Sequence, residues 1–170
     1  MDESSYTPTR EAVFTETLQI AIVVRDLDAT LRRYVDDYGI GPWQIHDFNA
    51  GDAEDLRVHG QPVERSSTPL TRFATTMVGQ VMWEVIEPLD EESIFARFLT
   101  EKGEGVHHIA VATERFDEAV AEQAERGNTL VLSGTFGDTK LAYLPTDRDL
   151  GAIIEIFSGM PGVEPEPDAS

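Results

Sequence analysis

Cysteine is absent from all 170 residues of the sequence. A disulfide scaffold, a thiol nucleophile and a cysteine-based zinc site are therefore excluded. No apolar run approaches the roughly 18–20 residues that a membrane-spanning helix needs. Residues 1–5 are acidic and lack the basic start and apolar centre of a signal peptide. These absences favour a cytoplasmic protein that has no membrane partner.

Basic residues are also scarce, with 13 Lys and Arg against 32 Asp and Glu, a formal net charge of −19. Such a surface repels nucleic acid and anionic membranes and offers no broad basic field for phosphorylated substrates. The sequence also lacks a Walker P-loop, a GxGxxG segment after a strand and a nucleophile elbow. Nucleotide-binding proteins and serine hydrolases of these types are thereby disfavoured, and a small-molecule substrate is the partner we expect.

The sequence instead contains an internal repeat. Residues 18–28 and 107–117 are near-copies, each an apolar β-run that leads into a helix beginning near an acidic residue. Residues 82–86 and 153–157 form a second pair, each an apolar strand with one carboxylate at its centre. A chain built twice from one unit can bring equivalent positions together across a pseudo-twofold axis. Four such positions carry side chains able to bind a metal: Gln19, Glu84, His108 and Glu155.

Each of these four side chains shares a strand face with apolar neighbours, because alternate residues of a strand point the same way. A lone buried carboxylate costs several kcal/mol unless it is paired or bound to a metal. Glu, His and an amide oxygen suit Zn²⁺, Ni²⁺, Co²⁺ or Mn²⁺. The same alternation predicts that His107 faces away from the site. The alternative is a protein without a metal, in which the four polar residues pair with one another.

The order of elements predicts an α+β fold in which β-α-β-β-β occurs twice. We divide the chain into a flexible N-terminal arm (1–14), a first βαβββ module (15–89), a linking helix (90–104), a second βαβββ module (105–159) and a disordered acidic tail (160–170). Asp90 is the expected cap of the linking helix, and a strand is expected over 129–133. The polar stretch 49–69 is long for a loop and is expected to be a lid or an excursion over the site.

With this repeat and these four polar positions, the chain resembles the vicinal oxygen chelate superfamily, also called the glyoxalase/bleomycin-resistance/dioxygenase superfamily. The resemblance covers about residues 17–158 and includes segments 103–110, 87–89 and 149–155, which are similar to the methylmalonyl-CoA epimerase branch. It implies paired βαβββ modules forming a half-open barrel around a metal, with ligands at the four positions above. The Gln, Glu, His, Glu set is similar to that of zinc-type glyoxalase I. The epimerase branch carries a further catalytic carboxylate on the third strand of its first module, and our alignment places Ala74 there.

The resemblance implies a metal-dependent isomerase, epimerase or lyase that stabilises an enolate or oxyanion of a small oxygenated substrate, such as an acyl thioester. Glu84 and Glu155 are the expected catalytic pair as well as metal ligands. A metal-free protein of the same fold that sequesters a small molecule is the alternative, and an extradiol-type dioxygenase is a third reading. Ring-cleaving dioxygenases hold Fe(II) with two His and one carboxylate, whereas Gln19 stands at the first His position. A homodimer is expected by analogy with the superfamily.

Overall fold

The computed structural model describes residue 8 and residues 11–158. The strands are β1 (Glu16–Val23), β2 (Gln44–Asn49), β3 (Glu54–Val58), β4 (Gln61–Pro62), β5 (Pro69–Val78), β6 (Val81–Pro88), β7 (Gly105–Ala112), β8 (Leu132–Phe136), β9 (Thr139–Leu144) and β10 (Ile153–Phe157). The helices are α1 (Leu27–Tyr38), α2 (Ile94–Glu101), α3 (Phe116–Glu125) and α4 (Asp147–Leu150). The predicted tail and most of the predicted arm lie outside the described residues, although Val13 and Phe14 pack against the core of the second half.

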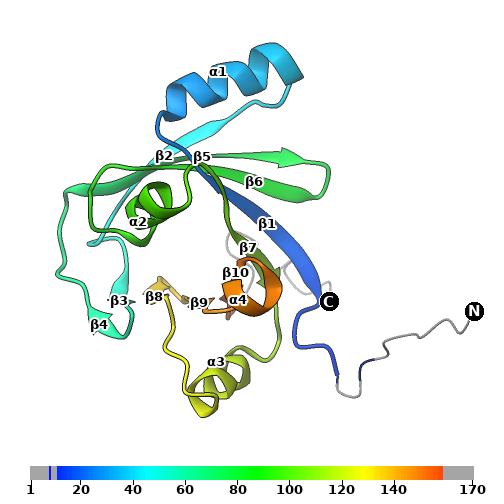
Figure 1. Cartoon of the computed structure of the whole chain (residues 1–170), viewed down its shortest axis with the longest axis vertical. Helices are drawn as coiled ribbons and strands as arrows, with labels where there is room; N and C mark the ends of the chain where they lie inside the picture. The colour runs from blue at the N-terminus through cyan, green and yellow to red at the C-terminus, as the bar shows by residue number, and fades with distance from the viewer. Residues whose placement is uncertain (1–7, 9–10, 159–170) are drawn as a thin grey trace, which may run out of the picture.

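The ten strands form one curved sheet in the order β2-β5-β6-β1-β7-β10-β9-β8-β3-β4 (Figure 1). Strands β1 and β7, at which the two halves meet, run antiparallel, and each has a parallel neighbour from its own half. In the first half Gln19 is opposite Met82, and in the second His108 is opposite Ile153. Glu84 lies two residues after Met82, and Glu155 lies two residues after Ile153, so the two carboxylates occupy equivalent positions. The predicted α+β fold with a repeated βαβββ unit is confirmed, and the sheet is not closed.

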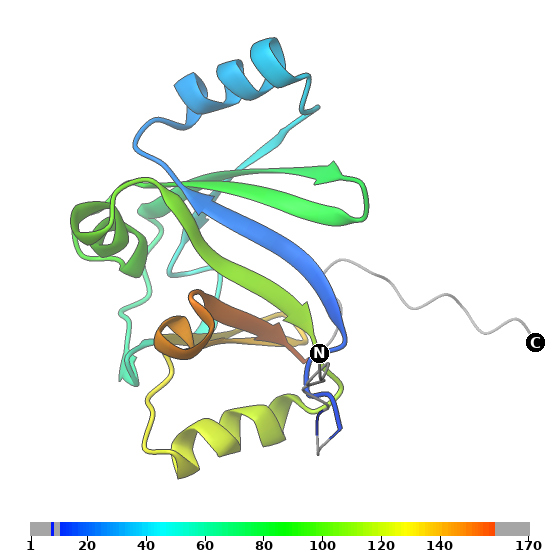
Figure 2. The ribbon, with the colours of Figure 1, turned by 45° about the vertical axis from the view of Figure 1, so that its right-hand side comes forward.

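Helices α1 and α3 cover the outer faces of the two halves, as Figure 2 shows at its top and bottom. Helix α1 packs Leu27 and Leu31 against Ala74 and Val85, while α3 packs Ala119 beside Ala142. Helix α1 begins where predicted, because the Asp26 side chain accepts a hydrogen bond from the backbone N–H of Ala29. The apolar stripes of both helices are thus used against the outside of the sheet, which leaves the inner face for the site.

Helix α2 differs from its prediction. Ser93 is its N-cap, and the Ser93 hydroxyl accepts from the backbone N–H of Ala96. The Asp90 side chain instead accepts from the backbone N–H groups of Glu92 and Ser93, so it organises the turn before the helix. The helix packs Ile94 and Phe95 into the cluster of buried residues on the inner face of the sheet. In this way α2 covers one end of the concave side.

The polar stretch 49–69 contains two strands that the sequence did not predict. Strand β3 pairs antiparallel with β8 of the second half, with Val58 opposite Leu132, and β4 pairs with β3. Ala50, Ala53 and Leu56 form a small buried cluster beneath this excursion. The Arg65 guanidinium donates to the carbonyl oxygens of Gly51 and Ala53. The stretch is therefore a paired extension of the sheet that crosses from the edge of one half to the edge of the other.

Two further differences concern the second half. The predicted strand at 129–133 lies three residues later, as β8. The one-turn helix α4 stands before β10, where the β-α-β-β-β order predicts no helix. Among the described residues, no helix is both long and apolar enough to cross a membrane.

Candidate active site

The concave side of the sheet encloses a cavity of about 420 Å³ between the two halves. Gln19, Glu84 and Glu155 line this cavity, and His108 lies fully buried behind its floor. Five phenylalanines from five different elements make up much of the wall: Phe48, Phe73, Phe95, Phe136 and Phe157. The volume lies within the range of cavities that bind small molecules.

The four residues predicted as metal ligands meet at one place. His108 Nε2 lies 3.1 Å from Glu155 Oε2 and 3.7 Å from Glu84 Oε2. Gln19 Nε2 donates to Glu84 Oε2 across 2.7 Å. The Glu84 side chain is 15% exposed and that of Glu155 is 5% exposed, both toward the cavity. The strand registers of the repeat thus bring one amide, one imidazole and two carboxylates together, and their role as metal ligands remains a prediction.

The donor set suits a divalent transition metal, because it combines carboxylate oxygens, an imidazole nitrogen and an amide that can present its oxygen. The side chains here contact one another directly. Within the described part of the chain, no three His, Cys, Asp or Glu side chains are spaced to hold an ion. The residues therefore fit a metal by their chemistry.

His107 does not face away from the site, contrary to the prediction from strand alternation. The β1–β7 register shifts where Ala21 is opposite His108 and Ile22 is opposite Val106, which leaves His107 as an extra residue. His107 Nδ1 consequently lies 3.0 Å from His108 Nδ1, and its ring contacts Phe95 and Phe98 of α2. A β-bulge has no reliable sequence signal, so the simple two-residue period failed here.

His107 determines which ring nitrogen of His108 carries the proton. Burial, with the neighbouring His108 and Lys102 as smaller causes, lowers the pKa of His107 to about 3, so its ring is neutral and can donate or accept. With His107 donating, His108 carries its proton on Nε2 and donates to Glu155. With His107 accepting, His108 Nε2 keeps a lone pair for a metal. The histidine pair thereby allows both tautomers of His108.

Tyr143 is a further side chain at the site, and the sequence analysis did not predict it. It lies directly opposite Glu155 in the β9–β10 pair, and its hydroxyl is 3.4 Å from His108 Nε2. Burial raises the pKa of Tyr143 well above its ordinary value, and the nearby Glu155 and Glu84 raise it further. The hydroxyl therefore stays protonated and is a hydrogen-bond donor. The signal in the sequence was its inward-facing position in the strand beside Glu155.

Ala74 does not occupy a cavity position, contrary to our alignment with the epimerase branch. It is fully buried beneath α1, on the outer face of the sheet. The residues of β5 that reach the cavity are Thr71 and Phe73, and Thr75 is directly opposite Glu84. Strand β5 contains no Asp or Glu, so Glu84 and Glu155 are the carboxylates that line the cavity.

Glu84 gives a prediction for the stability of the metal-free protein. Burial raises its pKa from 4.5 to about 7, and the nearby Glu155 charge adds to this, while His108 and the Gln19 hydrogen bond oppose it. Because the folded state favours protonated Glu84, the stability it contributes is complete below about pH 4.5 and is lost as the pH rises through 7. We expect this loss to be about 2–3 kcal/mol.

The measurement is urea unfolding of metal-free protein at several pH values between 4.5 and 8. Glu84→Gln should show a shallower fall in unfolding free energy over this range than the wild type. Glu91→Gln, an exposed carboxylate on the outside of the molecule, should keep the wild-type slope. Identical slopes for Glu84→Gln and the wild type would contradict the shifted pKa.

Comparison with known proteins agrees with this architecture. The family model described as Glyoxalase/Bleomycin resistance protein/Dioxygenase superfamily matches residues 18–143. Among solved structures, a Streptomyces coelicolor methylmalonyl-CoA epimerase superposes with a TM-score of 0.61 at 22% identity, covering 90% of this chain and 99% of that one. The Mycobacterium tuberculosis methylmalonyl-CoA epimerase gives 0.58 at 21% identity, covering 93% of both chains.

A curated relative, the uncharacterized protein YqjC of Bacillus subtilis (strain 168), is 27% identical over 129 residues, which is 72% of this chain and 89% of YqjC. The structural likeness, at identities below 25%, establishes the fold alone. The family match covers well over half of the chain, from β1 into β9, and ends before β10. On this ground the chain belongs to the glyoxalase/bleomycin resistance protein/dioxygenase superfamily.

Proposed function

We propose that this protein is a metal-dependent isomerase, epimerase or lyase that acts on a small oxygenated carbon acid, such as an acyl thioester or a hemithioacetal. The observation that carries the proposal is the convergence of Glu84 and Glu155 on His108 from equivalent strands of the two halves. Methylmalonyl-CoA epimerases are among the proteins of similar fold, which supports proton transfer at carbon as the type of chemistry.

A divalent metal (Zn, Ni, Co or Mn) held by Gln19, Glu84, His108 and Glu155 would supply Lewis-acid stabilisation of an enolate or oxyanion. The carboxylates provide the base and the acid. One of Glu84 and Glu155, as the carboxylate, removes a proton from the carbon beside the carbonyl. The other, which begins protonated, gives its proton to that carbon from its own side of the cavity. Because the two carboxylates come from opposite halves of the repeat, return to the opposite face of the carbon inverts its configuration.

Two further features of the chain assist this transfer. The apolar wall excludes water, which strengthens electrostatic interactions inside the cavity. The Tyr143 hydroxyl, protonated and beside Glu155, is placed to donate a hydrogen bond to a carboxylate or to a substrate oxygen at the floor of the cavity. These contributions come from the protein itself and need only the fold described above.

A metal-free protein that binds and sequesters a small molecule is the second candidate. It is favoured by the direct contacts among the four polar side chains, which already satisfy one another. An extradiol-type dioxygenase is disfavoured, because its iron requires two His and one carboxylate and Gln19 occupies the first His position. We further propose that the protein is cytoplasmic and forms a homodimer. Sedimentation analysis of the purified protein would check the dimer.

The test is elemental analysis combined with solvent deuterium exchange. Protein reconstituted with Zn, Ni, Co or Mn should hold about one metal per chain and catalyse exchange of the α-proton of an acyl thioester or hemithioacetal in D₂O. His108→Ala should lose the metal. Absence of metal after reconstitution with all four ions would overturn the metalloenzyme proposal and leave the binding protein. Metal bound without exchange in any substrate class would refute the isomerase chemistry.

A further inference from the structure

The cavity walls, as the described residues form them, include acidic, polar and apolar side chains but no basic one. Its lining comprises the two carboxylates, polar but uncharged Gln19, Thr71, Thr139 and Tyr143, and nine apolar side chains. Within residues 11–158, no Lys or Arg lines the cavity. A substrate that places a second carboxylate here would therefore have no protein cation to pair with, and unpaired burial of a charge is costly.

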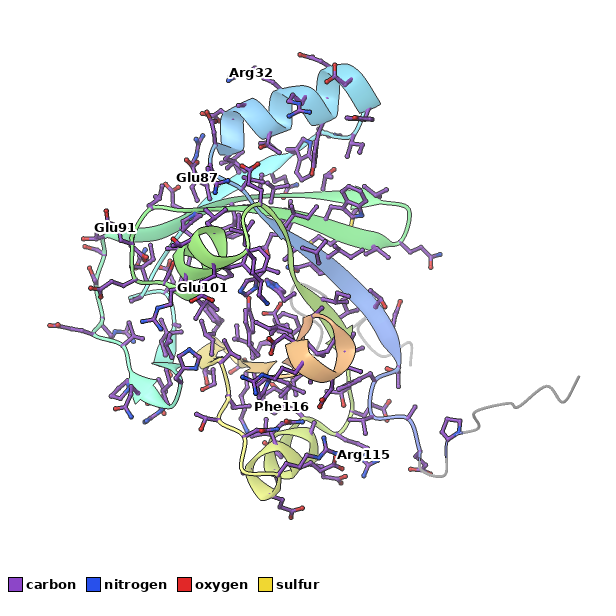
Figure 3. All side chains as sticks on the ribbon, in the orientation of Figure 1. Arg32, Glu87, Glu91, Glu101, Arg115 and Phe116 are labelled. Carbon is purple, nitrogen blue, oxygen red and sulfur yellow. The ribbon has the colours of Figure 1, made fainter. Side chains whose placement is uncertain are left out.

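Basic residues on the strands around the cavity point elsewhere. Arg72 lies between cavity-facing Thr71 and Phe73, and its guanidinium pairs with Asp28 of α1 at 3.0 Å. Lys140 lies between Thr139 and Leu141 and pairs with Asp117 of α3 at 3.3 Å. Arg57 of β3 pairs with Asp55 at 3.4 Å. Strand alternation therefore holds these cations outside, and Figure 3 likewise shows Arg32 and Arg115 at the outer ends of the molecule.

The apolar side chains give the cavity a preference of their own. Five phenylalanines, three leucines and Ile86 line a volume of about 420 Å³. That volume is large enough for an aromatic ring or a branched aliphatic group beside the reacting carbon. Phe73 and Phe48 stand on the wall of the first half, and Leu132 and Phe136 on that of the second, with Leu56 of the excursion next to β8.

Electrostatics of the floor point the same way. The floor presents the carboxyl groups of Glu84 and Glu155, and no Lys or Arg stands beside them among the described lining residues. These acidic groups would not pair with a carboxylate elsewhere on the substrate. Methylmalonyl-CoA, the substrate named for several proteins of this fold, bears such a carboxylate, so the lining differs from what a carboxylated acyl group requires.

We propose that the substrate is an uncharged α-oxygenated carbonyl compound that carries an aromatic or branched aliphatic group, and that the apolar cavity selects this group against carboxylated analogues. This inference rests on the proposed function for the reaction, but the selection itself is a property of the cavity walls. It names the substrate class by its chemistry: two adjacent oxygens toward the floor and an apolar group against the phenylalanine-rich wall.

The test compares two probes of nearly equal shape, 2-hydroxyacetophenone and its 4-carboxylate, by ligand-detected NMR titration of metal-free protein. The neutral probe is expected to bind on the order of a hundredfold more tightly than the carboxylate. Equal binding, or tighter binding of the carboxylate, by the wild-type protein would overturn the inference. This comparison needs no variant and does not depend on a bound metal.

Variants that add one positive charge at different places test whether the cavity wall causes the preference for the neutral probe. Phe73→Arg and Thr139→Lys each place a cation on the cavity wall. Each should improve binding of the carboxylate probe, so that the ratio of the two dissociation constants falls at least tenfold. Val78→Arg, which adds the same charge to an exposed position of β5 on the outer face, should leave the preference unchanged. An equal effect of Val78→Arg would show that net charge, and not the cavity, causes the selection.

Deuterium exchange separates the two proposals. Tighter binding of the neutral probe, together with exchange of its α-proton in metal-loaded protein, supports both the proposed enzyme and the proposed substrate class. The neutral preference without any metal binding or exchange refutes the proposed enzyme but upholds the substrate class for a binding protein. Exchange in carboxylated substrates, with no neutral preference, refutes the substrate class and upholds the enzyme.

Discussion

Glu155→Gln in the metal-loaded protein is expected to slow α-proton exchange by about 10²–10⁴-fold, the usual contribution of a positioned acid or base. The amide has nearly the shape of the carboxylate and can still occupy its place beside His108 and Tyr143. It cannot accept a proton at neutral pH. The rate is measured by the loss of the substrate α-proton signal in D₂O under saturating substrate.

Metal content must be measured on the same samples, because Glu155→Gln also removes a charged ligand. Rates are therefore compared per bound metal. Glu91→Gln, on the outer surface as Figure 3 shows, is the matched control and should exchange protons at the wild-type rate. Full activity of Glu155→Gln with its metal retained would remove Glu155 from the proposed chemistry, and the same reasoning applies to Glu84→Gln.

Leu27→Ala is expected to lower the free energy of unfolding by about 2–5 kcal/mol. Leu27 is fully buried at the start of α1 and packs in a cluster with Leu31, Ala74 and Val85. Truncation removes apolar contact and leaves a space that the fixed ends of α1 and β6 cannot fill. Because the cluster lies on the outer face of the sheet, the cavity itself should keep its ligand preference.

Urea unfolding at one pH measures this change. Leu150→Ala is the matched control, since Leu150 is 59% exposed on α4, and its effect should be within about 0.5 kcal/mol of zero. A loss below 1 kcal/mol for Leu27→Ala would mean that α1 contributes little to the stability of the first half.

The repeat in the sequence predicted the fold and the convergence of four polar residues for a physical reason. Strand alternation determines on which face of the sheet a side chain lies. An internal repeat determines which positions of the two halves lie close together. Gln19 with Glu84, and His108 with Glu155, needed only these two regularities. The acidic residue expected near the start of α1 also acts where predicted, as the N-cap Asp26, because capping depends on residues close in sequence.

The predictions that failed depended on information that is not local. Strand β3 exists because β8, some seventy-five residues later in the chain, offers it an edge, and segment 54–58 shows no such partner in its own composition. His107 turned inward at a bulge whose cause is the registration of two strands. Tyr143 reaches the site because β9 places it opposite Glu155, a pairing between two strands. The Ala74 alignment was one residue away from the cavity-facing Phe73, and one residue is enough to reverse a side chain in a strand.

The path of the excursion makes each half of the molecule dependent on the other. Strand β3 belongs by sequence to the first half, yet it pairs with the outermost strand of the second half. A polypeptide containing residues 105–158 alone would expose β8 as an open edge, ready to pair with another chain. The β1–β7 pair keeps the symmetry of the repeat, whereas the excursion breaks that symmetry and joins the two halves into one structural unit.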